Sequence, residues 1–128
     1  MNRAPPVSGA RARIIAAPGA QRAPESKMDH MATFFCRLNP PRLTFASDMT
    51  ADEASLMQEH GEYWHRGRTS GNVKAFGLVA DLNGAYGIGI VEFLDEAEAR
   101  TFTVNDPVIR AERGFHYDVS PMPLGVAV

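Results

Sequence analysis

Short runs of hydrophobic residues, alternating or continuous, predict four β-strands in the last hundred residues of the chain. The runs are ATFFCRL (32–38), NVKAFGLVA (72–80), AYGIGIVEFL (85–94) and FHYDVSP (115–121). They contain many β-branched or aromatic residues, and turn-forming residues separate them. The second and third runs are joined through Asn83–Gly84, a strong hairpin signal because both residues tolerate a positive φ.

A long helix is predicted between the first two strands. Thr50 and Glu53 have the spacing of a capping box, and the helix that they begin runs to about Gly67. The segment NPPRLTFASDM (39–49), which precedes it, is expected to be a loop with no helix, because its consecutive prolines hold the chain extended.

A second helix and a helical turn are predicted between the third and fourth strands. Asp95 and Glu98 repeat the spacing of a capping box at the start of the second helix. Asp106 is well placed as the N-cap of a further helical turn, since Pro107 follows it and suits the first helical position. Gly114 follows the end of this turn.

The order βαββαβ predicts an α+β domain of the ferredoxin-like class, with a four-stranded antiparallel sheet and both helices on one face. The third strand is apolar or glycine at nearly every position from Ala85 to Val91. A strand that is apolar on both faces needs cover on both. We therefore expect a homodimer, a dimeric α/β assembly in which a second copy supplies the missing cover.

The distribution of charge bears on the class of partner. The chain has 128 residues and a net charge of −2, with 45% hydrophobic and 22% charged residues, which is ordinary globular composition. Five basic and two acidic side chains lie in residues 1–30, so residues 31–128 are acidic. An acidic domain without a basic stripe does not favour nucleic acid as a partner, and a small-molecule ligand is the expected alternative.

Residues 1–30 are rich in Ala, Pro, Gly and Arg and are expected to form a disordered extension before a single domain over residues 31–128. Two alternatives remain open for this segment. Translation could begin at Met28 or Met31, or the Arg-rich segment could be an organelle transit peptide. No apolar run is long enough to span a membrane, so neither a membrane partner nor a membrane location is expected.

Cys36 is the only cysteine, so no internal disulfide is possible, and a buried strand thiol is expected rather than a nucleophile. A cytoplasmic, reducing location fits this composition. Neither the histidines nor the carboxylates have a recognisable metal spacing, and the glycines near residue 87 do not form a phosphate-binding loop. The sequence predicts no metal and no cofactor.

His60 is the candidate for chemistry. At about 100° per residue it lies about 60° from Met57 and about 40° from Trp64, inside the apolar stripe of the long helix. Two interpretations are open at this point. A backbone carbonyl would make it a satisfied core residue, whereas a carboxylate would hold one ring nitrogen and make the other a base. Asp106 is equally well explained as a helix cap.

Four segments together resemble the YciI-like (YCII-related) family: MTADEASLMQEHGEYW (49–64), FGLVAD (76–81), GAYGIGIVEFLDEAEA (84–99) and NDPVIRAERGFHYDVSPM (105–122). The resemblance covers about residues 32–122 and implies a dimeric ferredoxin-like fold whose cleft holds a His–Asp pair. By position, this pair is His60 and Asp106. The family often has Gly-Pro at the end of the second strand, whereas here Leu78 follows Gly77, a difference that concerns the mouth of the pocket.

Three functions are compatible with these features. The first is a small cofactor-free enzyme of the lyase, isomerase or dehydrochlorinase type, in which His60, oriented by Asp106, moves a proton on a small cyclic or carbonyl substrate. The second is a binding or accessory module that holds a ligand in the same cleft without turnover. The third is a structural dimer with a satisfied core histidine. For the first two we expect His60 to face a cavity with Asp106 at its rim.

Overall fold

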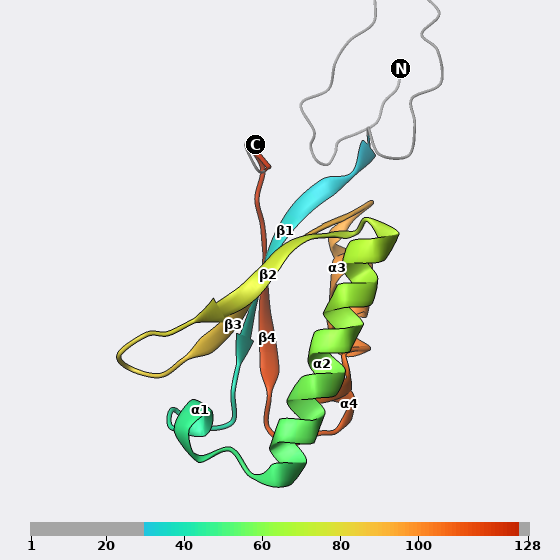
Figure 1. The fold of residues 1–128 in the computed structure, drawn as a ribbon. Coiled ribbons are helices and arrows are strands. Elements are labelled where there is room, and N and C mark those ends of the chain that lie inside the picture. The colour runs from blue at the N-terminus through green and yellow to red at the C-terminus, as the bar shows by residue number, and fades with distance from the viewer. Residues whose placement is uncertain (1–29, 126–128) are drawn as a thin grey trace, which may run out of the picture.

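A computed structural model describes residues 30–125 of the chain (Figure 1). The elements in chain order are β1 (Ala32–Asn39), α1 (Phe45–Asp48), α2 (Ala51–Ser70), β2 (Val73–Val79), β3 (Tyr86–Phe93), α3 (Glu96–Val104), α4 (Pro107–Arg110) and β4 (His116–Pro121). The expectations for residues 1–29, and for residues 126–128, lie outside the described part of the chain.

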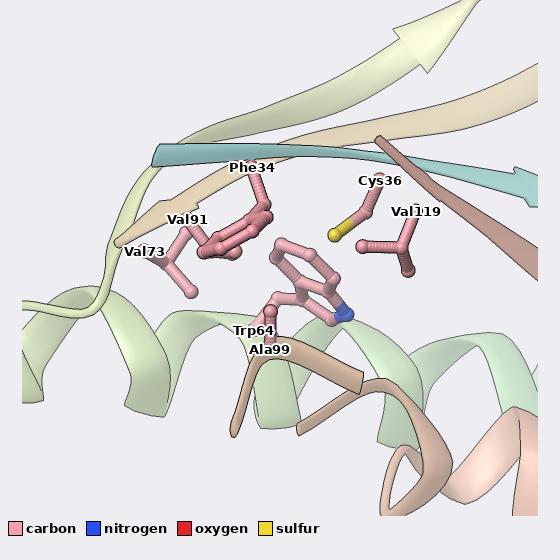
Figure 2. Packing of buried hydrophobic residues seen from close by; sticks show 7 residues of the cluster. All are labelled: Phe34, Cys36, Trp64, Val73, Val91, Ala99 and Val119. Atoms are coloured by element: carbon pink, nitrogen blue, oxygen red, sulfur yellow. The ribbon is translucent and has the colours of Figure 1, made fainter. Parts of the chain in front are cut away.

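The four strands form one open antiparallel sheet in the order β2–β3–β1–β4. The long helix α2 and the shorter α3 lie on the same face of this sheet (Figures 1 and 2). The structure therefore confirms the predicted α+β class, the βαββαβ order of the main elements and the location of both longer helices on one face of the sheet. The arrangement is consistent with a ferredoxin-like fold. Within residues 30–125, no helix is long and apolar enough to cross a membrane.

The prediction that residues 39–49 contain no helix is wrong. Phe45–Asp48 form the short helix α1, which begins beyond the reach of the two prolines. Its first residue, Phe45, is buried and meets the ring of Phe115 edge-on at a centroid distance of 5.1 Å. Burial of this one aromatic side chain gives the turn a tertiary anchor that the local sequence does not reveal.

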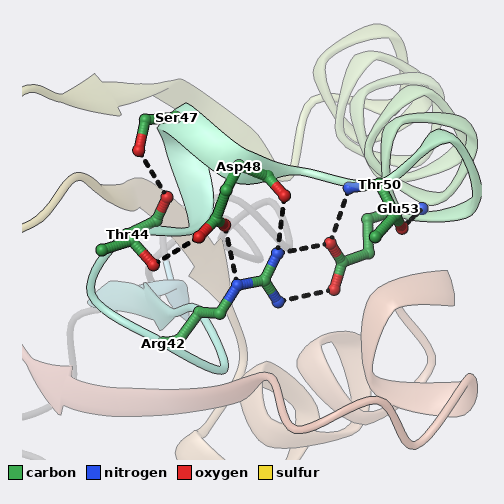
Figure 3. Close-up of polar contacts among 6 residues, drawn as sticks. All are labelled: Arg42, Thr44, Ser47, Asp48, Thr50 and Glu53. Carbon is green, nitrogen blue, oxygen red and sulfur yellow. Dashed lines mark hydrogen bonds and ion pairs between the residues drawn. The ribbon is translucent and has the colours of Figure 1, made fainter.

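The start of α2 is held as predicted and is then tied to the preceding loop (Figure 3). The Thr50 hydroxyl accepts from the Glu53 N–H at 3.1 Å, and the Glu53 carboxylate accepts from the Thr50 N–H at 2.9 Å. Arg42 donates to both oxygens of the same carboxylate, at 2.7 and 2.9 Å. These hydrogen bonds with Arg42 and Thr50 lower the pKa of Glu53 to about 2, so this anchor is charged at neutral pH.

The end of α2 lies three residues beyond the predicted boundary at Gly67. Gly67 is instead a packing position, because a Cβ there would meet Val73 Cγ2 at 2.5 Å. The helix ends at Gly71, whose φ of 96° is the left-handed conformation typical of a helix C-terminus. A glycine needed for close approach of α2 to β2 was thus mistaken for a glycine that ends the helix.

Trp64 is at the centre of the larger of two hydrophobic clusters (Figure 2). It points from α2 onto the sheet, where its ring occupies the space that a side chain at Gly89 would need. The cluster comprises Phe34, Cys36, Trp64, Val73, Val91, Ala99 and Val119. Burial raises the pKa of the Cys36 thiol to about 12, which agrees with a packing role for this cysteine.

A second, smaller cluster surrounds α1 and α4. It comprises Leu38, Phe45, Val108 and Phe115. Tyr117 of β4 packs against both clusters, so it lies at the boundary between them. The hydroxyl of Tyr117 forms hydrogen bonds with Trp64 and Asp106 at this boundary.

Candidate functional site

Four side chains from three regions of the chain form the candidate site. His60 and Trp64 lie one turn apart on α2, Asp106 lies in the connection between α3 and α4, and Tyr117 lies on β4. Asp106 has an extended backbone (φ −63°, ψ 133°) directly before Pro107. This conformation, which proline favours in the preceding residue, directs the carboxylate toward α2 and the sheet.

His60 and Asp106 are in direct contact. The distance from His60 Nδ1 to Asp106 Oδ2 is 2.8 Å, a hydrogen bond between residues 46 positions apart in sequence. The His60 side chain is 16% exposed, whereas that of Asp106 is completely buried. The expectation that Asp106 lies at a rim is therefore wrong, because the carboxylate is the deeper partner and the imidazole lies between it and solvent.

Capping and histidine binding, which the sequence presented as alternative explanations of Asp106, occur together. Its Oδ1 accepts from the Val108 N–H at 3.0 Å and caps α4, while Oδ2 is left for His60. A carboxylate has enough lone pairs for both tasks. The cap also fixes the orientation of Asp106 relative to α4, and this orientation sets the direction from which His60 is held.

Trp64 and Tyr117 are members of the site that sequence reasoning missed. The Trp64 Nε1–H donates to Asp106 Oδ2 at 2.8 Å, and the Tyr117 hydroxyl donates to the same oxygen at 2.5 Å. The sequence places Trp64 in the apolar stripe of the long helix and Tyr117 on the alternating strand of residues 115–121, with no polar role for either. The missed signal is that an indole N–H or a phenol O–H needs a hydrogen-bond partner when it is buried.

Asp106 is charged at neutral pH in this setting. Burial raises its pKa, but the hydrogen bond and the charge of His60 lower it. Hydrogen bonds from the Tyr117 hydroxyl and the Val108 N–H lower it further, so that the pKa of Asp106 lies below its ordinary value. An ionised carboxylate can only accept hydrogen bonds, and the contact therefore assigns the Nδ1 proton to His60.

The second ring nitrogen of His60 is available. Among residues 30–125, no protein group forms a hydrogen bond with Nε2. When Nδ1 carries the proton of a neutral imidazole, Nε2 carries the lone pair and can accept a proton. Leu56 and Met57 on α2 and Ile109 on α4 pack nearby against the smaller cluster, so the apolar surroundings expected for His60 are present.

His65 and His116 stand apart from this site. His65 is exposed on α2 and meets the edge of Phe76, and His116 is exposed on the opposite face of β4 from Phe115 and Val119. Within the described chain, no three His, Cys, Asp or Glu side chains are grouped so that they could hold a metal ion. The site is thus a histidine with a buried carboxylate.

The glycines of β3 contribute unequally to the surroundings of the site. Trp64 fills the space above Gly89, so this glycine serves close packing of α2 on β3. Above Gly87 the nearest side-chain atom is Cβ of Leu38, at 3.3 Å from the position of an added Cβ, and the three nearest atoms all come from β1 and β2.

Comparison with known families gives a match over most of the chain. The model of the YCII-related domain matches residues 33–123, which is most of the chain and includes all four residues of the site. A search of curated proteins finds no similar sequence.

Proposed function

The chain belongs to the YCII-related domain family, and on this premise we propose that it is a small, cofactor-free enzyme. In this proposal His60 and Asp106 move a proton on a small cyclic or carbonyl substrate, in chemistry of the lyase, isomerase or dehydrochlorinase type. The observation that carries the proposal is the 2.8 Å contact between His60 Nδ1 and a buried, ionised Asp106, together with an Nε2 that no described group occupies.

The proposed step begins with proton transfer from an acidic C–H or O–H group of the substrate to His60 Nε2. The imidazolium that forms is stabilised by the adjacent Asp106 carboxylate, which keeps its charge and takes no proton. In an isomerisation, Nε2 returns the proton to another atom of the substrate. In a dehydrochlorination, chloride leaves with the bonding electron pair, and the proton passes from Nε2 to solvent.

His60→Gln tests this proposal, because glutamine keeps a hydrogen-bonding side chain but cannot exchange a proton near neutral pH. The probes are γ-butenolides, whose weakly acidic γ-hydrogens exchange slowly with deuterium in D₂O without a catalyst. We expect the wild-type protein to accelerate this exchange and His60→Gln to lose about 10²–10⁴-fold of the acceleration. The rate is measured by ¹H NMR of the probe.

His65→Gln is the matched control, since His65 lies on the same helix but away from Asp106 and should leave the exchange rate unchanged. Equal acceleration by wild type and His60→Gln would contradict the proposal, as would the absence of acceleration for every probe. Saturable binding of a probe without exchange would favour the alternative function, a ligand-binding or accessory module. A loss of stability in His60→Gln with neither binding nor exchange in the wild type would favour a structural dimer.

We also propose that a second copy of the chain covers the sheet face opposite the helices. This face contains Phe35, Ile88 and Ile90, all half-buried in the single chain. Arg37 and Asp118 are register neighbours on the same face, joined through a common hydrogen-bond partner, Asn39. Apolar side chains beside one basic and one acidic group suit a self-complementary two-fold interface.

Sedimentation velocity at micromolar concentration tests the dimer. We expect wild type to have twice the monomer mass and Ile90→Glu to have the monomer mass, because a charge at the centre of this face would be buried without a partner. Leu82→Glu is the control, since Leu82 lies in the β2–β3 turn and is fully exposed (104%). A wild-type monomer, or a dimer that Ile90→Glu leaves intact, would contradict this assignment of the interface.

A further inference from the structure

We infer that Tyr117 is a positioning residue for the His60–Asp106 pair, an assignment that rests on the proposed function. Within residues 30–125, no hydrogen bond or ring contact joins Tyr117 directly to His60. It acts through Asp106, whose Oδ2 accepts its hydroxyl proton at 2.5 Å. The consequence for chemistry is that one tautomer of His60 is held, with the proton on Nδ1 and the lone pair on Nε2.

The origin of the donors to Asp106 Oδ2 distinguishes Tyr117 from the others. His60 and Trp64 both donate from α2, one turn apart, at 2.8 Å each. Tyr117 is the donor that comes from the sheet, on β4. Two donors on one helix move together with that helix, so the hydroxyl of Tyr117 is the donor that ties Oδ2 to the sheet.

The direction of the hydrogen bonds supports a fixed proton arrangement. The indole of Trp64 can only donate, and its Nε1–H lies 2.9 Å from the Tyr117 oxygen as well as 2.8 Å from Asp106 Oδ2. The Tyr117 hydroxyl therefore accepts from Trp64 and directs its own proton onto Asp106. Such a chain of hydrogen bonds strengthens each member by polarisation.

The Tyr117 hydroxyl keeps its proton throughout the neutral range. Burial, the adjacent Asp106 carboxylate and the hydrogen bond with it raise the pKa of Tyr117 above its ordinary value. Tyr117 is consequently a donor to Asp106 and not a base or nucleophile in its own right. With Val108 on Oδ1 and three donors on Oδ2, the carboxylate has no favourable position for a further proton.

The test is Tyr117→Phe in the full chain, with the His60 ring nitrogens observed by long-range ¹H–¹⁵N correlation NMR of the neutral imidazole. In wild type we expect widely separated Nδ1 and Nε2 resonances, as for a single tautomer. In Tyr117→Phe we expect the two resonances to move toward each other, because the carboxylate is less restrained and both tautomers are populated. Unchanged resonances would overturn the assignment.

Tyr63→Phe is the matched control, because the Tyr63 hydroxyl donates to the Phe102 carbonyl at 2.7 Å and not to Asp106. It should leave the His60 resonances unchanged, and an equal change in both variants would overturn the assignment. If Tyr117→Phe does not fold, uniform incorporation of 3-fluorotyrosine keeps the hydroxyl and makes it a stronger donor. A shift of the His60 nitrogen resonances would then support the role of Tyr117, and no shift would contradict it.

This experiment is independent of turnover, since the tautomer is measured without substrate. If Tyr117→Phe mixes the tautomers while His60→Gln retains deuterium exchange of the probes, the proposed function fails and the positioning role stands. If the tautomer is unchanged while His60→Gln loses exchange, the proposed function stands and the role assigned to Tyr117 fails.

Discussion

Replacing Asp106 with alanine is expected to lower the free energy of unfolding by about 3–5 kcal/mol. The variant leaves the Val108 N–H, the hydroxyl of Tyr117 and the ring of His60 without their acceptor, and it leaves the Trp64 N–H with the Tyr117 hydroxyl alone. Such a loss is a large part of the total stability of a typical domain, about 5–15 kcal/mol. Urea denaturation followed by tryptophan fluorescence would measure it, because Trp64 is the only tryptophan.

Asp95→Ala is the control for the capping function alone. Asp95 also caps a helix, with its carboxylate accepting from the Glu98 N–H at 2.9 Å, but it is exposed and makes no contact with the candidate site. Its loss is expected to cost about 1 kcal/mol. Equal losses for the two variants would show that Asp106 is no more than a helix cap.

Gly89→Ala is expected to destabilise the fold by about 1–3 kcal/mol, because the added methyl group would overlap the ring of Trp64. The overlap involves two ring carbons of a side chain that is only 2% exposed and packed on all sides, so it has no free space to move into. Movement of the indole would also disturb its hydrogen bond to Asp106 at 2.8 Å. Thermal unfolding by circular dichroism would measure the loss.

Gly87→Ala is the control on the same strand and the same face. A Cβ at Gly87 would lie 3.3 Å from Cβ of Leu38, a close contact that a small shift can relieve. We therefore expect a smaller loss than for Gly89→Ala. If the two variants lose the same stability, the cost comes from the strand backbone and not from the contact with Trp64.

Much of the fold follows from interactions between residues close in sequence. The capping box at Thr50, the N-cap at Asp95 and the β2–β3 turn closed by the Gly84 N–H on the Asp81 carbonyl at 3.0 Å all join residues three positions apart. The predicted box at Asp95 is only half formed, because the Glu98 carboxylate accepts from the Leu94 N–H and not from the Asp95 N–H. In the turn, Gly84 has a positive φ and Asn83 does not. Strand alternation in residues 115–121 likewise depends only on side chains that alternate between two faces. These features were predicted within a few residues because no distant part of the chain is needed to produce them.

The errors in the fold have one physical cause. At Phe45 the aromatic partner is Phe115, 70 residues away, and at Gly67 the close neighbour is Val73 on the next strand. In both places, burial against another element outweighed the local preference for a loop or for a helix end. A single sequence does not say which neighbours a residue will meet.

The candidate site divides in the same way. The helical period of α2 is enough to predict that His60 faces inward, and the place of Asp106 before Pro107 is enough to predict that it caps a helical turn. The meeting of these two residues depends on tertiary packing, as does the sharing of one carboxylate oxygen by the indole of Trp64 and the hydroxyl of Tyr117. Each of these hydrogen bonds joins elements that are brought together by packing of the helices on the sheet. Contacts between distant elements produce no repeating pattern of residues, so the sequence alone does not reveal them.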